Sequence, residues 1–276
     1  MRLRGENAAR AVTRFVTGGS NLVLGGRFQD LPYVSATDPG NGRFRVDPSP
    51  GLFGLRVLRA DGALADQSVR IALSAAIDRE EALGEIRGDS WGSAISILPR
   101  QLDSGFRPSA LELLQRKPAD RIAAAKRLIG GKKVRIRLAL PSGPGARLLF
   151  AALAHQWRTI GVESELSQPG QAADLALIDE VAPVNSALWY LGRMGCQTRL
   201  PCSDEADTAM LVAIRATNGA DRIASIAKAD SLLTAAHYYI PLALPLRWSL
   251  VDPELAGWRD NSVNAHPLLH LRPVAR

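Results

Sequence analysis

An acid pair follows the most apolar strand-like run of this sequence. The run "ADLALID" (173–179) is nearly all apolar, which is typical of a strand buried within an α/β sheet. Asp179 and Glu180 stand at its carboxyl end, where side chains of α/β domains commonly face a crevice. Two carboxylates in that position could carry out acid–base chemistry on a small substrate.

The sequence lacks the residues that usually accompany catalytic acids. No histidine has Cys, Asp or Glu at metal-ligand spacing, and neither an HExxH nor a GxSxG motif occurs. The acid pair therefore has no nucleophile or oxyanion partner, and we expect a protein that is not an enzyme. An enzyme that uses Asp179 and Glu180 as acid and base remains the alternative. The histidines are His155, His237, His266 and His270.

Two glycine-containing stretches could meet a phosphate or another anion. "IGGKKVR" (129–135) does not have the spacing of a phosphate-binding loop. "PSGPGAR" (141–147) opens a strong helical pattern, so its amides could meet an anion, although a plain strand-to-helix turn is the commoner meaning. We expect no cofactor and no metal.

Two cysteines, Cys196 and Cys202, are six residues apart in "GCQTRLPCS". This spacing does not fit a CxxC redox or zinc motif. A disulfide that closes a short loop and two free thiols are both compatible with the sequence.

The composition limits the class of protein. A chain of 276 residues can form one large or two ordinary domains. Its net charge of +7 is spread along the chain without a basic block, which argues against a nucleic-acid partner. No apolar run reaches 18 residues, and the basic N-terminus has no apolar segment behind it, so we expect neither a membrane span nor a signal peptide in this chain.

Periodicity and turn residues predict the order of the elements. Strands alternating with helices from 134 to 236 predict an α/β lobe. Expected strands cover 21–26, 52–59, 134–140, 162–166 and 173–179, and 240–251 is extended. Expected helices cover 8–15, 64–86, 145–162, 204–216 and 220–236, and 36–51 is expected to be loop.

The segment "VRIALSAAIDREEAL" (69–83) fits one continuous amphipathic helix. Val69, Leu73, Ala76 and Ile77 form one apolar stripe, and the charges that follow are expected to stay in water. The segment resembles the "VRxALxxAIDRxxL" helix of the family 5 solute-binding proteins, the dipeptide-, oligopeptide- and nickel-binding components of ABC importers.

Further segments resemble that family in the same order along the chain. The resemblance covers nearly the whole sequence, and its specific features are the helix containing "AIDR" (76–79) and the order of the segments. The matching segments are "RFVTGGSNLVLGG", "SWGSAISILPRQL", "PADRIAAAKRLI", "VRIRLAL…ARLLFAALAHQWRTIGVESEL", "ADLALIDEVAPVNSALWYL" and "IPLALPLRWSLVDPELAGWRDNSVNAHPLLHL".

The resemblance implies an α/β fold: a periplasmic-binding-protein-like lobe of type II with part of a second lobe, and with the N-terminal lobe largely missing. Residues 1–60 would be the tail end of lobe I and the hinge, 61–236 the second ligand-binding lobe, and 237–276 the return to lobe I. Asp78, Arg79 and Glu80 would be capping and surface-pairing residues of a scaffold helix.

The resemblance also implies a function without chemistry. The protein would be periplasmic, bind a peptide or similar small solute between two lobes, and deliver it to ABC permease subunits in the membrane. A truncated remnant without function is a further alternative.

The expected ligand-binding residues follow from the same resemblance. Peptide binders of the family place an Asp after the central strand, and here that position holds Pro183. Asp179 and Glu180 could take over the role of that Asp. The full set of expected ligand-binding residues is Asp179, Glu180, Asn185, Trp189, Arg247 and Trp248.

Overall fold

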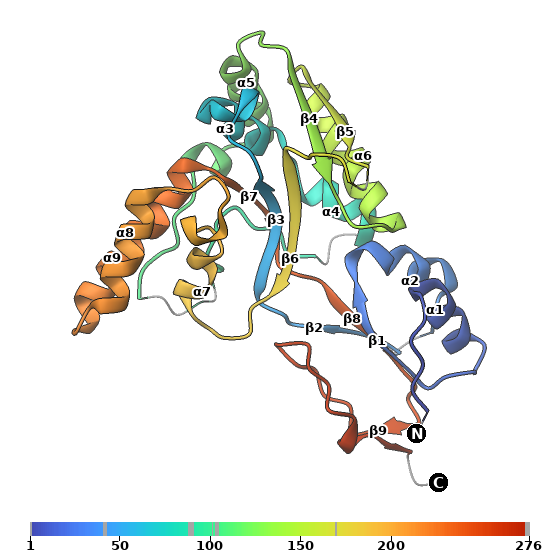
Figure 1. The fold of residues 1–276 in the computed structure, drawn as a ribbon. Coiled ribbons are helices and arrows are strands. Elements are labelled where there is room, and N and C mark those ends of the chain that lie inside the picture. Colours follow the sequence, from blue (N-terminus) through green and yellow to red (C-terminus); the bar gives the residue numbers. More distant parts are fainter. Residues whose placement is uncertain are drawn as a thin grey trace.

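A twisted five-stranded sheet runs through the centre of the computed structural model (Figure 1), which describes residues 2–40, 43–87, 91–100, 102, 105–168 and 170–273. Its strand order is β5-β4-β6-β3-β7. β4 is parallel to β5 and β6, whereas β3 is antiparallel to β6 and β7. The predicted apolar strand is indeed the central one. The bounds are β3 Gly51–Val57, β4 Val134–Ala139, β5 Val162–Leu166, β6 Leu175–Val181 and β7 Tyr239–Ala243.

Strand β3 separates two hydrophobic cores. All of its residues are buried, and successive side chains of a strand point to opposite faces of a sheet. Phe53, Leu55 and Val57 enter one core, whereas Leu52 enters the other. The sheet is therefore covered on both faces at β3, as the uninterrupted apolar pattern of this strand requires.

Helices cover both faces of this sheet. One core lies under α7, α8 and α9. The other lies under α3, α4, α5 and α6 (Figure 1) and also includes Phe15, Leu31 and Trp248, which lie outside this sheet. The bounds are α3 Gln67–Ala76, α4 Arg79–Arg87, α5 Pro118–Ile129, α6 Pro144–Arg158, α7 Ala187–Gly192, α8 Asp204–Arg215 and α9 Gly219–Ala236. Short 3₁₀ turns span Phe28–Asp30, Gly62–Ala65, Glu112–Gln115, Cys196–Thr198 and Leu268–His270.

A second, antiparallel sheet has the order β1-β8-β2 and lies beside α1 and α2. The chain passes between the sheets twice within a few residues, from β2 into β3 and from β7 into β8. The five-stranded sheet thus takes strands from all three predicted segments. These are β3 from 1–60, β4, β5 and β6 from 61–236, and β7 from 237–276. The bounds are α1 Ala8–Val16, β1 Leu22–Arg27, α2 Leu31–Thr37, β2 Phe44–Asp47, β8 Arg247–Val251, and the pair β9 Leu255–Ala256 with β10 Arg272–Pro273. Among the described residues, no helix is long and apolar enough to cross a membrane.

The prediction of one helix over 64–86 is wrong. The chain leaves the helix at Ile77, whose backbone is extended (φ −77°, ψ 118°), and a new helix begins after Asp78. The Asp78 carboxylate accepts the Glu81 N–H at 3.2 Å, as an N-cap does. The expected capping role of Asp78 is thereby confirmed.

The prediction that Arg79 is a surface residue is also wrong. Arg79 is 4 % exposed. Its guanidinium donates to the carbonyls of Pro241 (2.8 Å) and Ser74 (3.3 Å). Carbonyls at the end of a helix lack partners within the helix, so a buried guanidinium can satisfy several of them at once. Burial, followed by the charge of Arg121, lowers the pKa of Arg79 to about 9.

The N-terminus of α6 is closed by the protein itself. A Cβ atom at Gly145 would lie 2.3 Å from the Phe28 carbonyl oxygen, and one at Gly143 would lie 2.7 Å from that of Gln29. These glycines thus allow two backbone segments to pack closely. Of the two meanings left open for "PSGPGAR", the strand-to-helix turn is the one that the structure supports.

Candidate functional site

A groove of about 470 Å³ lies where the carboxyl end of β6 meets the second sheet. Residues of β6 and α7 line one side, and the ends of β1 and β8 line the other. A segment near the C-terminus completes the wall. The lining residues are Arg27, Asp179, Glu180, Val181, Pro183, Trp189, Arg193, Arg247, Val263 and Asn264.

An ion pair that is almost fully buried crosses the base of the groove. Arg247 Nη1 lies 2.7 Å from Asp179 Oδ1, and the two side chains are 4 % and 9 % exposed. Arg247 Nη2 also donates to the Asp179 carbonyl at 3.0 Å. Burial raises the pKa of Asp179, and Arg247 opposes this rise. Since Arg247 begins β8 and Asp179 is in β6, the pair ties the two sheets together.

A second ion pair lies at the rim. Glu180 accepts a hydrogen bond from Arg193, which follows α7, and both side chains are partly exposed. Trp189 of α7 forms part of the wall, and its ring makes an edge-on contact with Tyr190 at 4.9 Å between centroids. Arginine, carboxylate and indole together form a polar groove with one aromatic wall, which suits the binding of a small solute.

The structure brings four of the six predicted ligand-binding residues together, and the other two lie elsewhere. Asn185 is exposed and does not line the groove. Trp248 is 1 % exposed, and its Nε1 donates to the Arg27 carbonyl at 2.8 Å. Because Gly26 has no Cβ, the Trp248 ring can lie flat against the backbone of β1. Trp248 therefore belongs to the core that Phe53 and Leu55 also enter, and it does not line the groove.

Sequence reasoning missed Arg27, Arg193, Val263 and Asn264. Arg27 reaches the groove because β1 pairs with β8, where Arg27 stands opposite Arg247. That pairing joins residues 220 positions apart, and no local pattern reports it. A signal for Arg193 did exist, because it stands four residues after Trp189 on a helical pattern and so shares its face.

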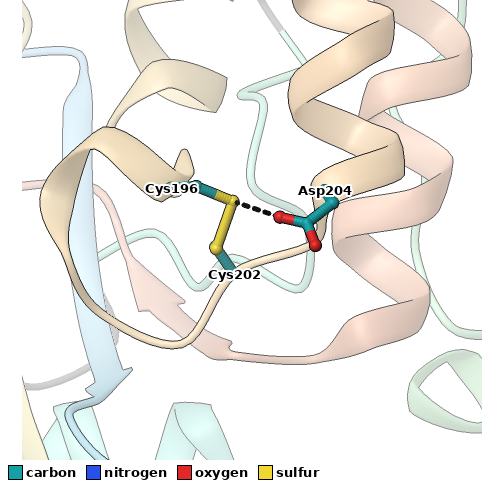
Figure 2. A group of neighbouring side chains, drawn as sticks. All are labelled: Cys196, Cys202 and Asp204. Carbon is teal, nitrogen blue, oxygen red and sulfur yellow. Dashed lines mark hydrogen bonds between the residues drawn. A yellow bond between two sulfur atoms is a disulfide. The ribbon is translucent and has the colours of Figure 1, made fainter.

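The two cysteine sulfurs are joined in a disulfide that closes a short loop between α7 and α8 (Figure 2). The Cys196 sulfur lies 3.4 Å from Asp204 Oδ1. Cys196, Cys202 and Asp204 place their donor atoms within 4.8 Å of one another, but disulfide sulfurs are not thiolates and so do not bind a metal as cysteine ligands do.

A buried arginine of β3 holds the disulfide loop. Arg56 donates to the Pro201 carbonyl, directly before Cys202, at 2.7 Å and to the Met194 carbonyl, two residues before Cys196, at 3.5 Å. Burial lowers the pKa of Arg56 to about 10. The loop is thus anchored to the central sheet close to Arg193.

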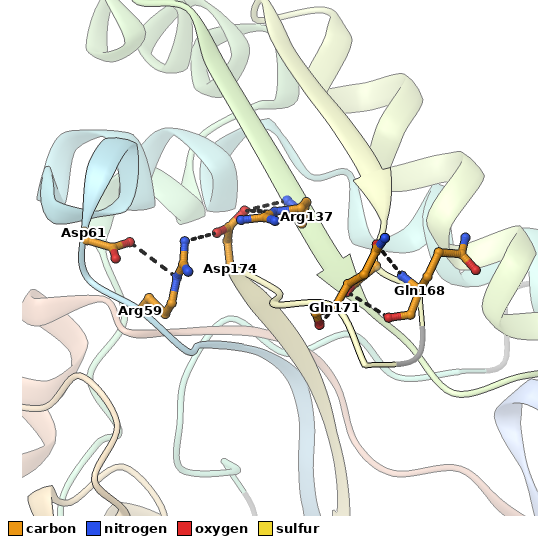
Figure 3. A network of polar contacts seen from close by, with 7 residues as sticks. Arg59, Asp61, Arg137, Gln168, Gln171 and Asp174 are labelled. Carbon is orange, nitrogen blue, oxygen red and sulfur yellow. Dashed lines mark hydrogen bonds and ion pairs between the residues drawn. The ribbon is translucent and has the colours of Figure 1, made fainter.

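A second hollow, of about 350 Å³, lies at the opposite end of the sheet. Asp174 organises it by pairing with Arg59 at 3.3 Å and by accepting the Arg137 N–H at 2.7 Å (Figure 3). Figure 3 also shows the hydrogen bond that the Gln168 backbone N–H donates to the Gln171 side chain in the loop before β6. The charges of this network compensate one another, so it serves to fix the loops at this end of the sheet.

No histidine lines the groove among the described residues. His237 is buried, and burial lowers its pKa to about 4. His266 pairs with Asp47 of β2 at 2.6 Å and stacks on Trp258. These contacts are structural, and within the described part of the chain the groove has charged groups but no nucleophile beside a base.

Comparison with known proteins gives a clear result for the fold. No family model and no curated protein sequence matches this chain. Haemophilus influenzae OppA, solved with the peptide RPPGFSPFR, superimposes with a TM-score of 0.84 over 99% of this chain at 17% identity. The Escherichia coli murein tripeptide-binding protein MppA gives 0.81 over 97% at 19% identity. NikA of Brucella suis, solved with Fe(III)-EDTA, gives 0.76 over 97% at 15% identity.

The chain spans little more than half of each of these proteins, namely 58% of OppA, 56% of MppA and 60% of NikA. Identities this low establish similarity of fold and leave the ligand open. In fold, the chain therefore matches a large part of the family 5 solute-binding proteins, which include periplasmic binding proteins for peptides.

Proposed function

We propose that this protein binds a peptide or a similar small solute reversibly in the groove and delivers it to an ABC permease in the membrane. The observation that carries the proposal is the position of the groove. It lies between two sheets and takes charged residues from both: Asp179 and Glu180 on one side, and Arg27 and Arg247 on the other. Sites between two such bodies suit binding by closure without chemistry.

The arrangement of the two sheets supports the proposal that the protein has two lobes. The five-stranded sheet and its helices would form the ligand-binding lobe predicted for 61–236, with β3 and β7 added from the flanking segments. The three-stranded sheet would belong to the other lobe. The short connections from β2 to β3 and from β7 to β8 would then act as hinge segments.

The cellular place of the protein follows from the same proposal. The similar structures include periplasmic binding proteins of Escherichia coli and Helicobacter pylori, and a periplasmic location would suit the Cys196–Cys202 disulfide. A membrane permease would then be the partner to which the loaded protein docks.

Thermal unfolding of the purified chain with pooled peptides tests the proposal. A ligand at 100 times its Kd adds about 2.7 kcal/mol to the stability of the folded state. We expect pooled di- to pentapeptides to raise the Tm in a concentration-dependent way and to be recovered chemically unchanged. Cleavage or modification of the peptides would instead favour the enzyme alternative, and an unchanged Tm with a broad, poorly cooperative transition would favour a remnant.

A further inference from the structure

The charged groups of the groove are not equally available to a ligand. Three arginines face two carboxylates there, which leaves one positive charge in excess. Asp179 and Arg247 neutralise each other, and their side chains are nearly inaccessible. A ligand that needs the Asp179 carboxylate would first have to break this buried ion pair, which is strongly unfavourable because it leaves a buried charge without its partner.

The Glu180–Arg193 ion pair at the rim is more exposed, and its two charges also balance. Glu180 and Arg193 are 37% and 45% exposed, and an exposed pair of this kind contributes little to stability. A ligand could therefore displace either partner at low cost. Because both partners are present, this pair by itself favours neither a cationic nor an anionic ligand group.

Arg27 gives the groove its excess positive charge. Its side chain is exposed and lines the groove, and within the described residues it forms no ion pair. Its backbone is held in place because its carbonyl accepts the Trp248 N–H. Across the β1–β8 ladder it stands opposite Arg247, another cation, and residues opposite each other in a ladder project to the same face. Since Asp179 already neutralises Arg247, the charge left for a ligand anion to compensate is that of Arg27.

We infer that the ligand presents a carboxylate to Arg27 and that Asp179 and Glu180 serve as internal counter-ions of Arg247 and Arg193. This inference rests on the proposed function and specifies the charge of the ligand group bound by this side of the groove. The planar guanidinium of Arg27 can bind a carboxylate through two parallel hydrogen bonds. The groove wall of Trp189 would cover the apolar part of the same solute.

Three chemical forms of one peptide pool test the inference. The pool consists of di- to pentapeptides without Asp or Glu, supplied with free ends, with an amidated C-terminus, or with an acetylated N-terminus. Apparent Kd values come from the concentration dependence of the Tm. We expect amidation to weaken binding about tenfold or more, since a hydrogen bond to a charged group contributes about 1.5–3 kcal/mol, and acetylation to change it less than threefold.

Variants of Arg27 locate the effect. Arg27→Gln should bind the free and amidated pools with Kd values within twofold of each other, and Arg27→Lys should keep part of the preference. Arg158→Gln removes an exposed arginine of α6 that does not line the groove, and it should behave as the unmodified chain does.

The outcomes separate the two proposals. Equal binding of the free and amidated pools by the unmodified chain overturns the inference and leaves the proposed function standing. Loss of binding on acetylation alone does the same and assigns the ligand's ammonium group to the acids. Absence of stabilisation by all three pools overturns both.

Discussion

Asp179 and Arg247 join the two sheets of this protein through one buried ion pair, 2.7 Å between Oδ1 and Nη1. Neither residue has a neighbour in sequence that predicts the other, since 68 positions separate them. The pair lies at the base of the groove and at the contact between β6 and β8. It therefore contributes to the stability of that contact and adds no net charge to the groove.

Removal of one partner of this pair should destabilise the protein strongly. Arg247→Met leaves the Asp179 carboxylate buried without a cation, and we expect a loss of about 3–5 kcal/mol in the free energy of unfolding, measured by urea denaturation. The double variant Asp179→Leu/Arg247→Met removes both charges and should be less destabilised than Arg247→Met. The second single variant is Asp179→Leu. If the double variant loses as much unfolding free energy as the two single variants together, the pair is not coupled as the structure indicates.

Arg79 is a structural residue of the helix break, and its replacement should reveal this. Arg79→Met removes several hydrogen bonds from buried carbonyls, and we expect a loss of at least about 3 kcal/mol in unfolding free energy, since each bond to a charged donor contributes about 1.5–3 kcal/mol. The adjacent Glu80 is exposed, and Glu80→Gln should stay within about 0.5 kcal/mol of the unmodified chain. Equal effects of the two substitutions would contradict the buried placement of Arg79.

His237 should make the protein lose stability in mild acid. Its pKa is lowered by burial to about 4 in the folded state, against 6.5 as its ordinary value. The unfolded chain therefore binds more protons between those two values, and stability falls as the pH drops from about 6.5 to 4. The loss should approach about 3 kcal/mol.

A conservative variant isolates that effect. His237 has a left-handed backbone (φ 54°) at the C-terminal end of α9, a conformation that Asn adopts readily. His237→Asn should therefore fold and should have a flatter stability profile between pH 4 and 6.5, measured by urea denaturation at a series of pH values. A profile as steep as that of the unmodified chain would mean that other groups cause the acid sensitivity.

The disulfide should stabilise the fold moderately. Closing a loop of this length contributes about 2 kcal/mol through the entropy of the unfolded chain. Cys196→Ser/Cys202→Ser should lose that amount and should no longer respond to dithiothreitol, whereas the unmodified protein should lose a similar amount when reduced. The measurement is urea denaturation with and without reductant. Equal stability of all four samples would show that the bridge contributes nothing.

Regular patterns predicted the centre of this fold correctly from the sequence. Strand β4 alternates strictly, with Val134, Ile136 and Leu138 buried, and α6 has a clear apolar stripe, so both appear close to the predicted bounds. Strand β2 was expected to be loop because its four residues lie between turn signals. The break at Ile77 was missed because the apolar period continues through it.

The groove could be predicted only in part, for a different physical reason. Asp179, Glu180 and Trp189 are close together in sequence, and the carboxyl end of a buried strand indicates where they lie. Arg27 and Asn264 reach the groove through the fold of the second sheet and the C-terminal segment. Such contacts depend on long-range pairing, which a single sequence does not report.

Trp248 and Trp189 have different surroundings, since Trp248 lies in the core and Trp189 lines the groove. Trp248 is buried in the core against Gly26 of β1, so Trp248→Ala should cost about 3–5 kcal/mol through the cavity it leaves. Trp189 is only partly buried, so Trp189→Ala should cost less, about 1 kcal/mol, because it loses less apolar contact. Peptide binding should show the opposite order, because Trp189 lines the groove and Trp248 does not. Binding is measured by the Tm shift with pooled peptides, in temperature scans that start where both variants are folded. If Trp189→Ala binds as tightly as the unmodified chain, the ligand does not use this groove wall.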